Sequence, residues 1–271
     1  MSTTLDYLLR VFSRPRQIAV AVVVAVAYGG LSAALPDLEL FPGLPGLRPM
    51  LALVVALAVL GGAPAAWGAL VGGFAIGLTG AGPAGQGPMG AIGEALAGFM
   101  TAIIAWKSGW MLRLRLRPNP DVPPRSRDWL WDSVLVALVC ALAYSAFLAW
   151  WSEITGERSF AYAAVVVTPN TCLELLVLLF PLIAILGPIA RRAGVVWQDP
   201  RGDATKLGWA RAGRAMVWAA AGICMAYGFA TYAHDATTLA NLARPEIVRG
   251  TVLWVSQAPL ILLLWLGALL G

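Results

Sequence analysis

The distribution of basic residues between long apolar runs is the feature that most constrains the fold of this chain. Eight apolar runs are separated by connections that fall into two alternating sets. One set holds 15 of the 19 Lys and Arg residues: Arg10, Arg14, Arg16, Lys107, Arg113, Arg115, Arg117, Arg125, Arg127, Arg191, Arg192, Arg201, Lys206, Arg211 and Arg214. The other set holds only Arg48, Arg158, Arg244 and Arg249. Because cytoplasmic loops carry an excess of Lys and Arg, this pattern predicts an even number of membrane spans with both termini in the cytoplasm.

The overall composition agrees with a membrane protein. The hydrophobic fraction is 59% and the charged fraction is 12%, whereas soluble domains carry about 25% charged residues. A pI near 9.4 would suggest nucleic-acid binding in a soluble chain. Here the cations flank apolar runs, so anionic lipid headgroups are their expected neighbours, and we predict no nucleic-acid partner. The predicted location is the bacterial inner (cytoplasmic) membrane, with a multi-pass topology.

The apolar runs predict an all-α integral membrane protein with a six-span helical core and two C-terminal spans. We expect spans at about 17–35, 48–60, 65–78, 89–110, 129–151, 163–190, 215–233 and 251–270. Residues 1–16 are expected to form an interfacial amphipathic helix, because one helical face carries Leu5, Leu8, Leu9 and Phe12. The predicted organisation is therefore this helix, a core over 17–192, a cytoplasmic loop over 193–214 and an extension over 215–271.

Three of the predicted spans are unusual. The second and third are near the lower length limit, since roughly 20 residues are needed to cross the hydrocarbon core. They are separated only by Gly61-Gly62-Ala63-Pro64, so they form either two spans or one re-entrant pair. We favour two spans joined as a helical hairpin. The sixth contains Pro169, Pro181 and Pro188, and we expect it to be broken or kinked.

Small residues recur at helical spacing on the first and third spans. Ala21 and Ala25 are four positions apart, as are Gly68 and Gly72. Small side chains allow the backbones of membrane helices to approach closely. We therefore predict a close contact between these two spans through these four residues.

The sequence excludes several kinds of chemistry. The only histidine is His234, so a haem bound by two histidines and a His-rich metal site are both excluded. A single pigment or haem ligand at His234 stays open beside a solvated interfacial histidine. No Walker A motif, intramembrane Ser/His/Asp set or paired aspartates in facing spans is present. We predict no enzymatic activity, no cofactor and no metal site, and buried thiols at Cys140, Cys172 and Cys224.

Ionisable groups at membrane depth are the remaining functional signal, because burying them is costly. Glu94 lies near the outer end of the fourth span, and Glu174 lies in the sixth, four positions after Asn170. Asn170 and Glu174 share a helical face, and Pro169 removes an N–H that would bond the carbonyl one turn earlier. One interpretation is a polar ligand-binding pocket lined by Glu94, Asn170 and Glu174. The other is that both glutamates are paired or protonated structural groups.

Several motifs occur together over residues 17–192. They are an Ala-rich run from Ala19 to Ala34, Gly46-Leu47-Arg48-Pro49, the Gly-Gly-Ala-Pro connection, a glycine-spaced third span, and Thr-Pro-Asn-Thr-x-x-Glu in the sixth span. In this combination the chain resembles the S components, the substrate-binding subunits, of energy-coupling-factor vitamin transporters. The resemblance covers six of the eight predicted spans.

The resemblance implies a non-catalytic subunit that binds a vitamin-like small molecule in an outward-opening pocket. It also implies that the early small-residue spans, with Ala21, Ala25, Gly68 and Gly72, dock on a membrane partner coupled to separate ATPases. The chain departs from the family by its two additional spans and long inner loop. A second hypothesis therefore stands beside the first: an accessory or scaffold subunit of a larger membrane assembly, such as an energy-transducing or pigment–protein complex, contacting other subunits and lipids.

Overall fold

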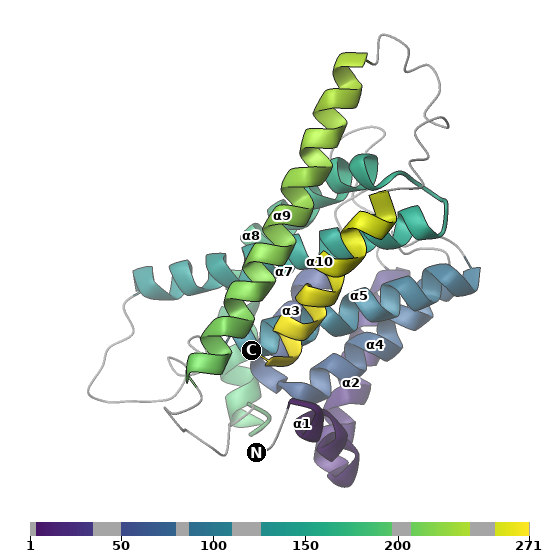
Figure 1. Cartoon of the computed structure of the whole chain (residues 1–271). Helices are drawn as coiled ribbons and strands as arrows, with labels where there is room; N and C mark the ends of the chain where they lie inside the picture. Colours follow the sequence, from purple (N-terminus) through teal and green to yellow (C-terminus); the bar gives the residue numbers. More distant parts are fainter. Residues whose placement is uncertain are drawn as a thin grey trace.

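Figure 1 shows the computed structural model of the chain. The structure describes residues 4–34, 50–79, 87–109, 126–196, 207–238 and 253–270. Within these ranges the regular elements are all helical. The all-α class predicted from the apolar runs is thereby confirmed.

The helices follow the apolar runs closely. Their bounds are α1 (Thr4–Arg10), the 3₁₀ helix η1 (Val11–Ser13), α2 (Pro15–Ala34), α3 (Met50–Gly61), α4 (Ala63–Leu78), α5 (Gly87–Ser108), α7 (Ser126–Ile154), α8 (Phe160–Arg192), α9 (Leu207–Thr238) and α10 (Leu253–Leu270). By length and composition, four stretches of the described residues are able to cross a membrane: Pro15–Ser32, Gly87–Ser108, Trp129–Ile154 and Phe160–Arg192. Helices α3 and α4 and the Gln257–Leu270 part of α10 are shorter apolar helices. The count of six plus two spans stays a prediction.

The two short helices do not pack along each other as a hairpin. Helix α3 packs mainly on α8 and α5, whereas α4 packs mainly on α5 and α2, and α3 and α4 share few contacts. They are joined at Gly62, whose φ of 70° and ψ of −144° suit only glycine. Both helices pack on α5, but α3 also packs on α8 and α4 on α2, so they do not pack as the predicted hairpin. Ten of the 12 residues of α3 are buried, as expected for a helix that is apolar on all sides.

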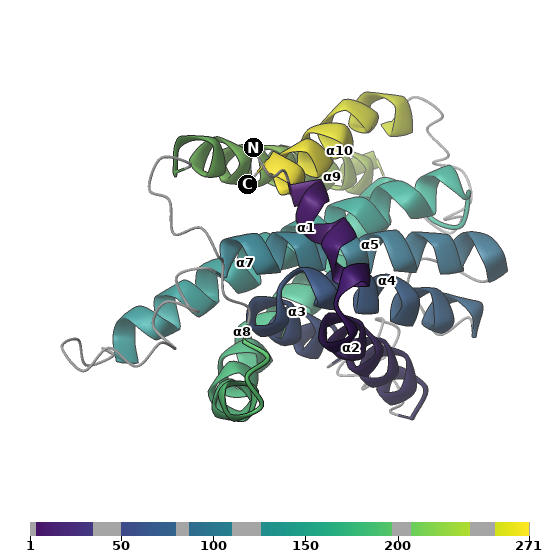
Figure 2. The same ribbon diagram turned by 90° about the horizontal axis from the view of Figure 1, so that it is seen from below.

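Helix α8 is continuous. It extends over 33 residues from Phe160 to Arg192 and includes all three prolines. Of the two predicted alternatives, a broken helix is excluded, and a kinked helix stays a prediction. Membrane helices tolerate proline because neighbouring groups can satisfy the backbone carbonyls that it leaves free. In Figure 2 part of α8 is seen nearly end-on, whereas α5 and α7 lie across the view.

Helices α2 and α4 approach closely through small residues. A Cβ atom added to Gly68 would lie 2.5 Å from the Ala21 carbonyl oxygen, and one added to Gly72 would lie 2.9 Å from that of Ala25. No larger side chain fits at either glycine without moving a backbone. The predicted close contact between the first and third apolar runs is confirmed. A similar contact joins the end of α4 to α5, where a Cβ on Gly77 would overlap the backbone of Ala91.

The N-terminal helix packs against the other helices through Leu8. Leu8 is only 3% exposed, its carbonyl accepts a hydrogen bond from Trp67 Nε1 at 2.9 Å, and the hydroxyl of Thr4 donates to the carbonyl of Leu269. The other three residues of the predicted apolar face are more than half exposed: Leu5, Leu9 and Phe12. The face is therefore divided between the protein and its surroundings, and the interfacial location stays a prediction.

The ends of the described helices form two groups. At one end, a guanidinium nitrogen of Arg16 donates to the carbonyl of Ala193, and the N- and C-terminal helices meet, as Figure 2 shows. We call this the basic end, because it carries Arg10, Arg14, Arg16, Lys107, Arg191, Arg192 and Arg214. At the opposite end, Trp151 Nε1 donates to the Met89 carbonyl at 3.0 Å, beside the turn that carries Glu157 and Arg158. Helices α5 and α7 are thus antiparallel, because the start of α5 lies beside the end of α7. The alternating topology of all the spans stays a prediction.

The C-terminal helices pack on the six-helix core. In Figure 1, α10 lies beside α9 and over α5 and α7. The pair is linked by a buried hydrogen bond of 2.9 Å between Cys224 Sγ and Gln257 Oε1. Gly267 of α10 lies so close to α9 that an added Cβ would be 2.8 Å from the Gly213 carbonyl oxygen. The extension therefore contributes to one continuous helical assembly.

Candidate functional site

Glu94 lies at the junction of three helices. Its side chain on α5 is only 2% exposed. Its Oε1 atom accepts hydrogen bonds from the hydroxyl of Tyr28 on α2 at 3.0 Å and from that of Tyr144 on α7 at 2.7 Å. We call these three residues the Glu94 cluster. The ionisable carboxyl group of Glu94 thus accepts from two donors on different helices, in the half of the molecule away from the basic end.

Small residues make room for the Glu94 cluster. The Tyr28 ring lies against Gly72, where an added Cβ would be 2.9 Å from Tyr28 Cβ, and near Gly98, where it would be 3.5 Å from Tyr28 Cε1. On the other side of α5, the Trp151 indole occupies the space beside Gly93. The glycine spacing that brings α2, α4 and α5 together therefore also positions one of the two tyrosines on the carboxyl group.

Glu174 has a different environment. Its Oε1 accepts a hydrogen bond of 3.0 Å from the backbone N–H of Ala52. Helix α3 begins at Met50, so Ala52 is in the first turn, where N–H groups have no partner within the helix. A carboxylate at this position also interacts favourably with the positive end of the helix dipole. Glu174, which is 4% exposed, therefore caps α3 from α8.

Asn170 lies one helical turn before Glu174 on α8 and is half-buried. Helix α8 and helix α5, which carries Glu94, share few contacts, while α3 and α7 each contact both. The two glutamates consequently bind different helices: Glu94 binds α2 and α7, and Glu174 binds α3. The single pocket predicted from Glu94, Asn170 and Glu174 stays a prediction, and it would have to extend between α3 and α7.

Sequence reasoning underestimated the tyrosines. Neither Tyr28 nor Tyr144 was predicted as a site residue from the sequence. A tyrosine within an Ala- and Gly-rich membrane helix is nevertheless a usable signal, because a buried hydroxyl needs a hydrogen-bond partner. Ala21, Ala25, Gly68 and Gly72, predicted to bind a partner, contact one another within this chain. Partner binding by them stays a prediction.

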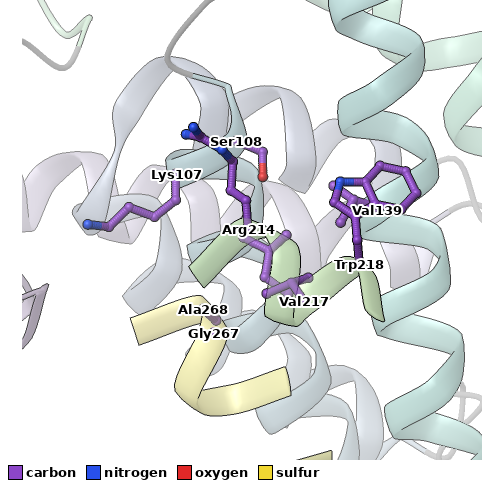
Figure 3. Close-up of a pocket in the computed structure, with 9 residues that line it drawn as sticks. Lys107, Ser108, Val139, Arg214, Val217, Trp218, Gly267 and Ala268 are labelled. Carbon is purple, nitrogen blue, oxygen red and sulfur yellow. The ribbon is translucent and has the colours of Figure 1, made fainter. Parts of the chain in front are cut away.

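A hollow lies at the basic end, between the core and the C-terminal helices (Figure 3). It is lined by Ile104, Lys107, Ser108, Val139, Arg214, Val217, Trp218, Gly267 and Ala268. Its cavity volume of about 10 Å³ is roughly the space that one water molecule needs. The hollow is separate from both glutamates. Lys107 is at the C-terminal end of α5, far along the helix from Glu94, and no residue of α8, which carries Glu174, is among the lining residues.

The part of the chain that the structure describes contains no group of three or more His, Cys, Asp or Glu side chains placed to hold a metal ion. Cys140 and Cys224 are buried, and Cys172 is partly buried. Comparisons with protein-family models, with curated proteins and with solved structures find no match to this chain.

Proposed function

We propose that this chain is a membrane-embedded, non-catalytic subunit that binds a vitamin-like small molecule for uptake and is coupled to separate transmembrane and ATPase subunits. The observation that carries the proposal is the Glu94 cluster. A carboxyl group that is 2% exposed within an apolar helix is costly, and such groups are usually kept for a function. The motif resemblance over residues 17–192 supports the same interpretation.

The chemistry of the cluster favours a ligand that offers hydrogen-bond donors or a positive charge. Glu94 Oε1 already accepts two O–H donors, and an incoming N–H or O–H group can replace either hydroxyl without leaving the carboxyl group unsatisfied. The displaced tyrosine hydroxyl can then accept from the ligand in turn. In this proposal Asn170 and Glu174 extend the binding surface on α8, and Ala21, Ala25, Gly68 and Gly72 hold the early helices in the arrangement that a membrane partner binds.

The most direct test is the small-molecule content of the purified protein. We expect mass spectrometry of the detergent-purified chain to detect a bound small molecule in the wild type and its loss, by roughly tenfold or more, in Glu94→Gln. This factor corresponds to one hydrogen bond to a charged group. Glu157→Gln, at an exposed carboxyl group of the same end, is the matched control. No small molecule in the wild type, or equal retention in Glu94→Gln, would contradict the proposal.

The proposed orientation places the basic end in the cytoplasm of a bacterium, with the Glu94 cluster toward the outside. It is supported by the cations gathered at that end. In sealed cells, a membrane-impermeant maleimide should label a cysteine introduced by Glu157→Cys and leave one introduced by Arg192→Cys unlabelled. The unaltered chain, with its three native cysteines, measures the background. The reverse labelling pattern would invert the topology.

A second candidate function is an accessory or scaffold subunit of a larger membrane assembly. It is favoured by the capping of α3 by Glu174, because this carboxyl group is then explained by the stability of the fold alone. Stoichiometric recovery of other membrane proteins with the purified chain, without a bound small molecule, would support this candidate over the first.

A further inference from the structure

We propose that the hollow at the basic end is a binding site for a phosphate group, supplied by the headgroup of an anionic phospholipid. Three helices form its rim. Lys107 and Ser108 are in the last turn of α5, Arg214 is in the second turn of α9, and Gly267 and Ala268 are near the end of α10. Figure 3 shows the side chains of Lys107 and Arg214 extending toward the same side of the hollow.

The electrostatics of the rim favour an anion. The C-terminal ends of α5 and α10 each contribute about half a negative charge, which together roughly cancel one cation. Lys107 and Arg214 bring an ammonium and a guanidinium group to the same rim, and these two groups attract an anion. The side chain of Lys107 lines the hollow, and its ammonium group lies 4.8 Å from the centroid of the Trp106 ring. The Arg guanidinium has five donors in a planar fork that matches phosphate.

The floor of the hollow explains why a lipid suits the site better than a free phosphate. Beneath the cations the lining is apolar and includes Ile104, Val139, Val217 and the ring of Trp218. The cavity of about 10 Å³ is too small for a phosphate, so the phosphate must lie on the rim. A lipid in this position can extend its acyl chains along the exposed side chains of α10: Leu262, Leu263, Leu266 and Leu270. Basic pockets between helices on the cytoplasmic side are typical binding sites for anionic headgroups.

The site also has a structural consequence. The hollow lies where α9 and α10 meet α5 and α7, so a bound headgroup contacts both the core and the C-terminal extension. The close approach of Gly267 to Gly213 and Val217 keeps the two C-terminal helices together beneath it. An anionic lipid is therefore expected to stabilise the packing of the extension on the core.

The test uses the full-length protein, stripped of lipid by detergent exchange, and measures thermal stability and lipid retention by native mass spectrometry. We expect dioleoylphosphatidylglycerol to stabilise the wild type and to remain bound, whereas dioleoylphosphatidylcholine has a smaller effect. Retention of phosphatidylglycerol should fall by roughly tenfold in Arg214→Gln and again in the double variant Lys107→Gln/Arg214→Gln, as expected for one charge-assisted contact each. Arg192→Gln, an exposed cation of the same end, is the matched control and should retain the lipid.

The remaining arms identify the source of the phosphate and guard against a folding defect. One outcome is that inorganic phosphate stabilises the wild type against thermal unfolding, phosphatidylglycerol does not, and Arg214→Gln abolishes the stabilisation by phosphate. This outcome would support the phosphate site and show that its ligand is soluble. If Arg214→Gln fails to fold, Arg214→Lys keeps the charge without the planar fork and should show intermediate retention. Equal lipid retention in the wild type, the double variant and the Arg192→Gln control would overturn the proposal.

Discussion

The two buried carboxyl groups of this protein are satisfied in different ways. Glu174 accepts a hydrogen bond from a backbone N–H in the first turn of α3, whereas Glu94 accepts from two tyrosine side chains on α2 and α7. A backbone donor at a helix start is fixed in place and must be satisfied for the helix to begin there. A side-chain donor can rotate away and be replaced by another donor. The comparison therefore assigns Glu174 primarily to stability and leaves Glu94 as the group better suited to exchange partners.

The Glu94 cluster also depends more strongly on close helix packing than the environment of Glu174 does. Tyr28, one of its two donors, rests against Gly72 of α4, so the position of the donor depends on the distance between α2 and α4. Glu174 instead depends on where α3 begins. Substitutions that alter packing, capping or individual hydroxyls should therefore affect the two regions separately.

The largest effect is expected from Gly72→Leu. A Cβ at this position would lie 2.9 Å from both the Ala25 carbonyl oxygen and Tyr28 Cβ, so the two helices must separate. Overpacking typically costs 1–3 kcal/mol, and we expect about 3 kcal/mol or more here because backbone as well as side-chain atoms must move. Thermal unfolding in detergent measures the loss, which should be accompanied by loss of any molecule bound at the Glu94 cluster.

Gly30→Leu provides the matched control for that experiment. Gly30 is on the same helix as Tyr28, but no atom lies within 4 Å of an added Cβ. The free energy of unfolding should not fall, and it can rise by up to about 1 kcal/mol because leucine favours a helix more than glycine does. Equal losses in Gly72→Leu and Gly30→Leu would mean that α2 and α4 are not in contact at Gly72.

A smaller effect is expected at Glu174, and it should depend on the substituted residue. Glu174→Leu leaves the Ala52 N–H without its acceptor in a buried location, which typically costs about 1–3 kcal/mol. Glu174→Gln retains a carbonyl oxygen for this bond and loses only the charge–dipole interaction, of about 0.3–1 kcal/mol. The difference in thermal stability between the two variants measures the contribution of the hydrogen bond from the Ala52 N–H to residue 174. Equal destabilisation by Leu and Gln would show that the charge of Glu174, rather than the cap, is what the protein uses.

The sequence predicted where the helices begin and end better than it predicted which helices pack against each other. Boundaries such as those of α4 and α10 follow from apolar runs, and the four-residue spacing of Gly68 and Gly72 correctly indicated a close helix contact. Periodicity identifies which residues share a face, but not which helix that face meets. Tyr28 and Tyr144 are 66 and 50 positions from Glu94, so their convergence depends on the packing of three helices. Whether α8 is broken or only kinked at its three prolines could not be decided from the sequence for a similar reason, because the continuity of the helix depends on neighbours that satisfy the backbone.

The smallest effects are expected from removing single hydroxyls of the Glu94 cluster. Hydrogen bonds between membrane helices contribute about 0.6 kcal/mol on average and about 1.7 kcal/mol at most. We expect Tyr144→Phe to cost more than Tyr28→Phe, because its bond to Glu94 Oε1 is 2.7 Å long rather than 3.0 Å. Tyr162→Phe, at a tyrosine that is 40% exposed, is the control and should have no measurable effect.

A double-mutant cycle with Glu94→Met shows whether these small losses arise from the cluster itself. Met has a similar length but offers no strong acceptor, so Tyr144→Phe should cost almost nothing once the carboxyl group is absent. The coupling energy should then approach the cost of the single Tyr144 substitution, because the two residues are in direct contact. The same cycle with Tyr28 should give a smaller value. If Tyr144→Phe costs the same in both backgrounds, the Tyr144 hydroxyl stabilises a group other than Glu94. The proposal that the Glu94 carboxyl group exchanges hydrogen-bond donors more readily than that of Glu174 would then lose its support.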